Sequence, residues 1–164
     1  MDKSPITPHH LHTSRGKLPH WQLGGSWYFV TFRAKELLSP VARDTVAECI
    51  VHSHQIKYDL AIASVMPDHV HILLRPREKT PQSFFALPEI MRAVKGVAAR
   101  KINEMKKGTG EIWQKESFDR IMRDEDEWRE KYEYIRNNAV KAGLAESPRD
   151  YPWLLEHDNF IKRP

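Results

Sequence analysis

The sequence contains one cysteine and no long apolar run. Because Cys49 is alone among 164 residues, an internal disulfide framework and a zinc site built from several cysteines are both excluded. No stretch reaches the roughly 18 consecutive apolar residues that a membrane span requires, and residues 1–20 lack the apolar segment of a signal peptide. These absences predict a cytoplasmic protein with no membrane partner.

The composition is that of one globular domain. Hydrophobic residues make up 40% and charged residues 29% of the chain, which is enough apolar material for a core. We expect three parts: a flexible, basic and His-rich arm at 1–20, a folded domain at 21–144, and a tail at 145–164 that packs on the domain. The net charge of +4 permits a polyanionic partner without demonstrating one.

Hydrophobic periodicity predicts an α+β fold. Strands are expected at 27–32, 58–66, 70–74 and 118–122, and helices at 39–55, 89–107 and 124–141. This order of elements suits the ferredoxin-like split βαβ sandwich, a four-stranded antiparallel sheet with helices on one face. The last helix, which carries several tyrosines, is additional to that pattern.

Two histidines follow the break between the middle strands. On a strand, residues i and i+2 point to the same face, so His69 and His71 present two imidazoles side by side, a pair suited to a divalent metal. Asp68 points the other way, so a His-Asp-His triad is not expected from this strand. The spacing fits two exposed or hydrogen-bonded histidines equally, and a metal would need a third ligand from elsewhere.

The last helix offers a tyrosine and an amide outside its apolar stripe. At helical spacing the stripe consists of Trp128, Tyr132, Ile135 and Ala139. Tyr134 and Asn138 lie four residues apart and to one side of it. A phenol beside a metal can serve as a nucleophile, and an amide oxygen can serve as a ligand. The same placement also fits a tyrosine at the edge of the core and a solvated asparagine.

Several motifs together resemble a known family. They are Gly24–Phe32, Pro67–His71, Trp113-Gln114 and Tyr134–Leu144. In this order and spacing they resemble the single-tyrosine HUH transposases, most closely the REP-associated tyrosine transposases, which act on palindromic repeats in bacterial genomes. The resemblance runs from about residue 18 to residue 155.

The resemblance implies a reaction and a role for each residue. His69, His71 and Asn138 would hold Mg²⁺ or Mn²⁺, and Tyr134 would cleave and rejoin single-stranded, hairpin-bearing DNA through a 5′-phosphotyrosine. Because that bond conserves the energy needed for rejoining, the absence of a phosphate-binding loop is consistent with this chemistry. The implied protein is a monomer or homodimer of the bacterial cytoplasm, associated with the nucleoid.

The chain departs from the family at two positions. Ala139 stands where a proline is frequent, which favours a longer helix. Arg120 follows Asp119 where related sequences often have a histidine, so the role of that histidine is in doubt and a phosphate contact by arginine is the replacement we expect.

Basic residues are concentrated between positions 75 and 107, a segment that contains nine Lys or Arg and three Glu. The residues we expect to contact DNA are Arg15, Lys17, Arg75, Arg92, Lys95, Arg100 and Arg120. A Lys/Arg face is also the ordinary solvated side of an amphipathic helix. Two other functions therefore stay open on the residues alone: a non-catalytic nucleic-acid-binding module of the same fold, and a His-based metallohydrolase that uses a metal-bound water.

Overall fold

The computed structural model describes residues 11–13, 21–23 and 25–156, and its centre is one antiparallel sheet. In spatial order the strands are β8 (Trp113–Ile121), β3 (Tyr28–Ala34), β5 (His69–Pro76), β4 (Tyr58–Val65) and β9 (Leu154–Glu156). The predicted ferredoxin-like α+β fold is confirmed. The sheet has five strands rather than the predicted four, because the tail supplies β9, which pairs with β4.

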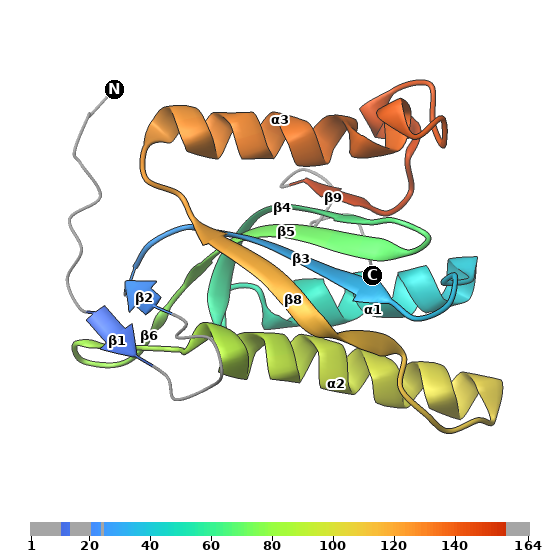
Figure 1. Ribbon diagram of the computed structural model, residues 1–164, viewed down its shortest axis with the longest axis horizontal. Coiled ribbons are helices and arrows are strands. Elements are labelled where there is room, and N and C mark those ends of the chain that lie inside the picture. The colour runs from blue at the N-terminus through green and yellow to red at the C-terminus, as the bar shows by residue number, and fades with distance from the viewer. Residues whose placement is uncertain (1–10, 14–20, 24, 157–164) are drawn as a thin grey trace.

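Helices cover both faces of this sheet. Helices α1 (Pro40–Ser53) and α2 (Leu87–Lys106) pack on one face, and α3 (Glu125–Lys141) crosses the other, as Figure 1 shows. The two faces contain separate apolar clusters. Alternation along β3 explains this, since Val30 and Phe32 belong to the cluster under α1 and α2 whereas Phe29 belongs to the cluster under α3.

Local signals in the sequence set the helix starts. The backbone N–H of Ala42 donates to Ser39 Oγ at 3.2 Å, and Pro40 is the first residue of α1. Asp124 caps α3 in the same way, accepting from the N–H of Glu127 at 2.8 Å. Strand β8 begins at Trp113, five residues before the predicted strand. The sequence pattern missed its first part because the residues after Trp113 are mostly exposed and show no alternation of apolar and polar side chains.

The remaining elements are short. Strand β1 (Leu11–Thr13) pairs with β2 (Trp21–Leu23), and β6 (Glu78–Thr80) pairs with β7 (Ser83–Phe84). A 3₁₀ turn, η1 (Pro148–Asp150), precedes β9. The rest of the predicted arm at 1–20, with Arg15 and Lys17, lies outside the described residues. Within the described ranges, no helix has the length and apolar character needed to cross a membrane.

The cluster under α3 holds this helix on the sheet. Ile135 and Ala139 are buried at 0% and 2% exposure, and they pack with Phe29, Leu73 and residues of the tail. Tyr134 neighbours Ile135 along the helix and is 40% exposed. Packing of the stripe therefore fixes the direction in which Tyr134 leaves α3.

Removal of the Ile135 side chain beyond Cβ should destabilise the protein. We expect Ile135→Ala to lower the free energy of unfolding in urea by about 2–5 kcal/mol, because it opens a cavity between α3 and the sheet. Ile56, which is 58% exposed, is the matched control. Ile56→Ala should change the free energy of unfolding by less than about 0.5 kcal/mol. Equal losses for the two variants would contradict this packing.

Candidate active site

His69 and His71 lie next to each other on the face of β5 that α3 covers. Their ring centroids are 4.6 Å apart, and the rings stand at 70° to one another. His71 is buried, and His69 is partly exposed. Both therefore occupy the face that the i, i+2 spacing assigns to a single side of the strand.

His71 is held by Thr31 on the neighbouring strand. The two residues are partners in the register of β3 and β5, and Thr31 Oγ1 lies 2.7 Å from His71 Nδ1. Burial, together with the charges of His69 and Arg33, lowers the pKa of His71 to about 3. His71 is therefore neutral near pH 7. When its Nδ1–H donates to Thr31, the lone pair of Nε2 stays available for a ligand.

His69 is oriented by the preceding residue. Asp68 Oδ1 lies 2.6 Å from His69 Nδ1, and Arg33 lies 3.5 Å from the other carboxylate oxygen of Asp68. Partial burial acts to raise the pKa of the Asp68 carboxyl, but the contacts with His69 and Arg33 outweigh it and keep that pKa below its ordinary value. Because β5 begins at His69, Asp68 precedes the strand. The rule that successive side chains of a strand point to opposite faces therefore does not apply to Asp68. Asp68 contacts the pair as a hydrogen-bond partner of His69.

Helix α3 brings Tyr134 to the buried histidine. The ring centroids of Tyr134 and His71 are 5.3 Å apart, and both rings pack against Phe29, at 6.0 Å and 5.5 Å. Lys131 Nζ lies 5.8 Å from the centroid of the Tyr134 ring. A phenol, an imidazole and a cation thus contact one buried aromatic ring, that of Phe29.

Two polar atoms of this region are buried and lack partners. Within the described part of the chain, His71 Nε2 and Asn138 Oδ1 have no hydrogen-bond partner. Asn138 lies one helical turn beyond Tyr134, so the two side chains leave α3 on the same side. An unsatisfied buried acceptor is costly, and coordination to a bound cation is one way in which such an atom is satisfied.

The donor set fits a hard or borderline divalent metal. Imidazole nitrogen and amide oxygen are ligands accepted by Mn²⁺ and, for the oxygen, by Mg²⁺. No group of three or more His, Cys, Asp or Glu that could hold a metal occurs among residues 11–13, 21–23 and 25–156. Asn138, whose amide oxygen is buried without a hydrogen-bond partner among the described residues, is the candidate for a third protein ligand.

The residues predicted to contact DNA do not form one surface. Arg75 and Arg120 are on the strands, where Arg75 pairs with Asp59 at 3.0 Å and Arg120 pairs with Glu127. Arg92, Lys95 and Arg100 are on α2, across the sheet from Tyr134. The structure therefore separates the basic set into two groups on opposite faces.

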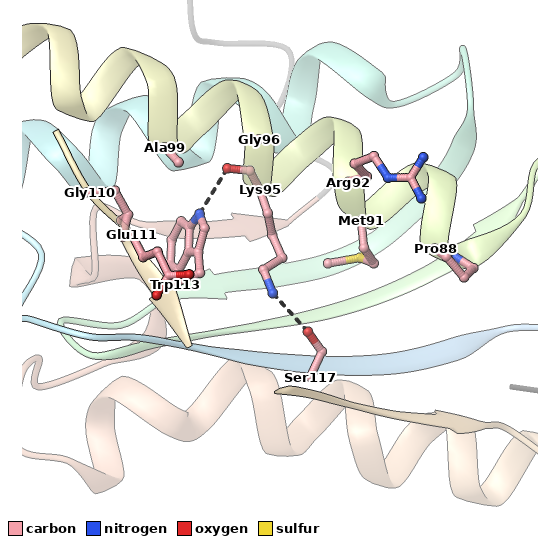
Figure 2. A pocket seen from close by; sticks show the side chains of 11 residues that line it. Pro88, Met91, Arg92, Lys95, Gly96, Ala99, Gly110, Glu111, Trp113 and Ser117 are labelled. Atoms are coloured by element: carbon pink, nitrogen blue, oxygen red, sulfur yellow. Dashed lines mark hydrogen bonds between the residues drawn. The ribbon is translucent and has the colours of Figure 1, made fainter. Parts of the chain in front are cut away.

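Arg92 and Lys95 line a pocket between α2 and the start of β8. Its volume is about 410 Å³, and Figure 2 shows both side chains at its wall. Lys95 Nζ donates to Ser117 Oγ at 3.1 Å, and the Trp113 indole N–H donates to the Lys95 carbonyl at 2.9 Å. Burial lowers the pKa of Lys95. These bonds tie α2 to the edge strand.

Sequence patterns did not indicate three of the side chains that shape the site. Phe29 and Thr31 lie in the Gly24–Phe32 motif, but no role was predicted for either, and Lys131 lies outside the motifs. The contacts of Phe29 and Thr31 depend on the register of β3 with β5 and on the position of α3. A reliable strand register would have paired Thr31 with His71. The i, i+3 spacing of Lys131 and Tyr134 on α3 is a local signal that places Lys131 beside the tyrosine.

Comparison with known proteins assigns the family. Residues 29–138 match the family model described as "Transposase IS200 like". The chain belongs to this family. The matched segment begins at Phe29 and ends at Asn138, so it contains every residue of the cluster around Tyr134.

Two relatives of this IS200-like transposase extend the likeness over most of its length. A REP-associated tyrosine transposase of Haemophilus influenzae is 20% identical over 142 residues, which are 81% of each chain. A solved structure, of a REP-associated tyrosine transposase bound to a REP hairpin, superimposes with a TM-score of 0.72 at 17% identity. The superposition covers 92% of this chain and 89% of the chain of the solved structure, and it shows that the two proteins share a fold.

The buried imidazole should resist protonation in the metal-free protein. A histidine in a short peptide titrates near pH 6.5, whereas the pKa of His71 lies at about 3. We expect the ring nitrogen signals of His71 in NMR spectra to stay those of a neutral ring from pH 7.5 to about pH 4.5. A midpoint above about pH 5.5 for this ring would show that His71 is open to water and contradict the geometry described above.

Proposed function

We propose that the protein cleaves and rejoins single-stranded, hairpin-bearing DNA by forming a covalent 5′-phosphotyrosine at Tyr134. The observation that carries the proposal is the 5.3 Å separation of the Tyr134 and His71 rings. His71 Nε2 and Asn138 Oδ1, one helical turn beyond Tyr134, are in addition buried without hydrogen-bond partners among the described residues. Membership of a transposase family agrees with this chemistry.

In the proposed reaction the Tyr134 hydroxyl attacks a backbone phosphorus. The bond from phosphorus to the tyrosine oxygen forms, the bond from phosphorus to the 3′ oxygen breaks, and the phenol proton is released as the 3′ hydroxyl forms. Attack by a 3′ hydroxyl on the phosphotyrosine reverses these changes and rejoins the strand. Each step exchanges one phosphate ester for another, so no nucleotide cofactor is consumed.

We propose His69, His71 and Asn138 as the ligands of Mg²⁺ or Mn²⁺. Bound there, the cation would polarise the phosphate oxygens and stabilise charge that develops on them. Asp68 and Thr31 each hold an Nδ1 atom, which directs both Nε2 atoms away from their hydrogen-bond partners. Such outer contacts fix the tautomer and orientation of metal-binding histidines.

The DNA partner is proposed from charge and from likeness. The solved relative is bound to a REP hairpin, and we propose a hairpin with single-stranded flanks for this chain. Contacts from Arg92, Lys95 and Arg100 on α2 would neutralise phosphates, with Arg15 and Lys17 of the arm as further contacts. Arg75 and Arg120 would have to leave Asp59 and Glu127 to do so.

One copy of the chain contains the whole proposed catalytic set. Tyr134 packs against His71 of its own chain, so we propose that a monomer is sufficient and that no exchange of α3 between copies is needed. A bacterial, cytoplasmic and nucleoid-associated protein is the setting that this substrate implies.

Loss of the phenol oxygen should abolish covalent capture of DNA. We expect Tyr134→Phe to form no denaturation-resistant adduct with a hairpin oligonucleotide in Mn²⁺, because the ring is kept and the nucleophile is removed. Binding of the same oligonucleotide, measured by fluorescence anisotropy, should change by less than about three-fold and should weaken as salt is raised.

Tyr132 provides the matched control, because it lies on the same helix with its hydroxyl 3.4 Å from Glu156. Tyr132→Phe should keep adduct formation. An adduct that survives Tyr134→Phe contradicts the assignment of the nucleophile. Strand cleavage that persists without an adduct would instead identify a His-based metallohydrolase, and binding with neither product by the wild-type chain would identify a non-catalytic module.

Metal removal and loss of the Thr31 hydroxyl should both act on the metal-dependent formation of the adduct. We expect EDTA to stop adduct formation and Thr31→Val to raise the Kd for Mn²⁺, followed by electron paramagnetic resonance, by about 10- to 100-fold. Thr45, whose hydroxyl bonds to the Val41 carbonyl in α1, is the control, and Thr45→Val should leave the Kd unchanged. An unaltered Kd in Thr31→Val would show that Thr31 does not orient a metal ligand.

A further inference from the structure

Phe118 is a large aromatic side chain that is exposed beside the proposed active site. It lies on β8 and is 56% exposed, whereas most aromatic side chains of the sheet are buried. Its ring meets the edge of Phe29 with 6.3 Å between centroids. Among the described residues Phe29 is the only ring that Phe118 contacts. Phe29 also contacts the rings of His71 and Tyr134, so it connects Phe118 to these two residues.

The strand register places Phe118 in line with His71. Thr31 pairs with Phe118 on one side and with His71 on the other, so the three residues form a row across three adjacent strands. Residues in such a row point to one face of the sheet, which is the face that α3 crosses. Two strand spacings, about 10 Å, separate the backbone of Phe118 from that of His71.

Packing does not account for the exposed face of Phe118. Strand β8 is an edge strand in the part of the sheet that the structure describes, and α3 crosses the sheet toward β4 and β5. Two cations lie near this face. Lys131 Nζ is 5.6 Å from the Phe29 ring, and the exposed Arg33 is two residues from Thr31 on β3; each also contacts a carboxylate, Glu130 and Asp68 respectively. An aromatic surface flanked by cations is complementary to a nucleotide, whose base stacks and whose phosphate is anionic.

We propose that Phe118 is the stacking platform for the unpaired base next to the phosphate that Tyr134 attacks. This inference rests on the proposed function and adds to it a subsite for one nucleotide. Stacking of that base would hold the strand across β3, with its backbone directed over Phe29 toward Tyr134 and His71. Because every base has a flat face, this contact contributes affinity and register without reading sequence.

The test uses binding alone, in a protein that cannot cleave. Tyr134→Phe is mixed with hairpin oligonucleotides that carry 2-aminopurine, a base whose emission is quenched by stacking, at one flank position at a time. We expect strong quenching at a single position, within one nucleotide of the site where the wild-type protein forms its adduct. Adding Phe118→Ala should remove that quenching and raise the Kd about ten-fold, and Phe118→Trp should restore both.

Leu144 is the control for loss of an exposed apolar side chain, since it is 46% exposed, and Leu144→Ala should change neither quenching nor Kd. Unchanged quenching and Kd in Phe118→Ala overturn the inference. So does a dimer that Phe118→Ala converts to a monomer in analytical ultracentrifugation, because Phe118 would then be covered by a second copy. The absence of adducts with Phe118-dependent quenching would refute the role of Tyr134 and leave the stacking site supported.

Discussion

The packing of α3 against the sheet face opposite α1 and α2 determines where Tyr134 lies relative to the two histidines. Ile135 and Ala139 are buried in the apolar cluster on that face, and this contact leaves Tyr134 beside the His71 ring. The helix therefore supplies the phenol, while the sheet supplies the imidazoles. Because rigid elements hold both parts, their relative position does not depend on a loop.

Burial and hydrogen bonding act differently on the two histidines. His71 is kept neutral by its low-dielectric surroundings and is oriented by Thr31, whereas the more exposed His69 is oriented by Asp68. A neutral imidazole with a fixed tautomer is the form that binds a cation. In the proposed metal site, the Asp68 carboxylate and the Thr31 hydroxyl would hold the two imidazoles in place before metal binds, which would lower the reorganisation needed when metal and DNA bind.

Periodicity predicted the elements well and their three-dimensional relations only in part. The i, i+2 spacing of His69 and His71 and the i, i+4 spacing of Tyr134 and Asn138 are local properties, readable from one strand and one helix. The face of the sheet that α2 covers is set by the connection and the tertiary packing, so helical spacing alone did not show that Arg92 and Arg100 lie across the sheet from Tyr134. The contact of Thr31 with His71 and the fifth strand formed by Leu154–Glu156 depend on pairing between distant segments.

The most direct test of the account is the position of a bound metal. In crystals grown with Mn²⁺, an anomalous difference map should show one strong peak in contact with His69 Nε2, His71 Nε2 and Asn138 Oδ1, next to the hydroxyl of Tyr134 from the same chain. A peak at another site, or a peak at the two histidines with Tyr134 turned away into solvent, would contradict the claim that α3 and β5 together form one metal-assisted nucleophilic centre.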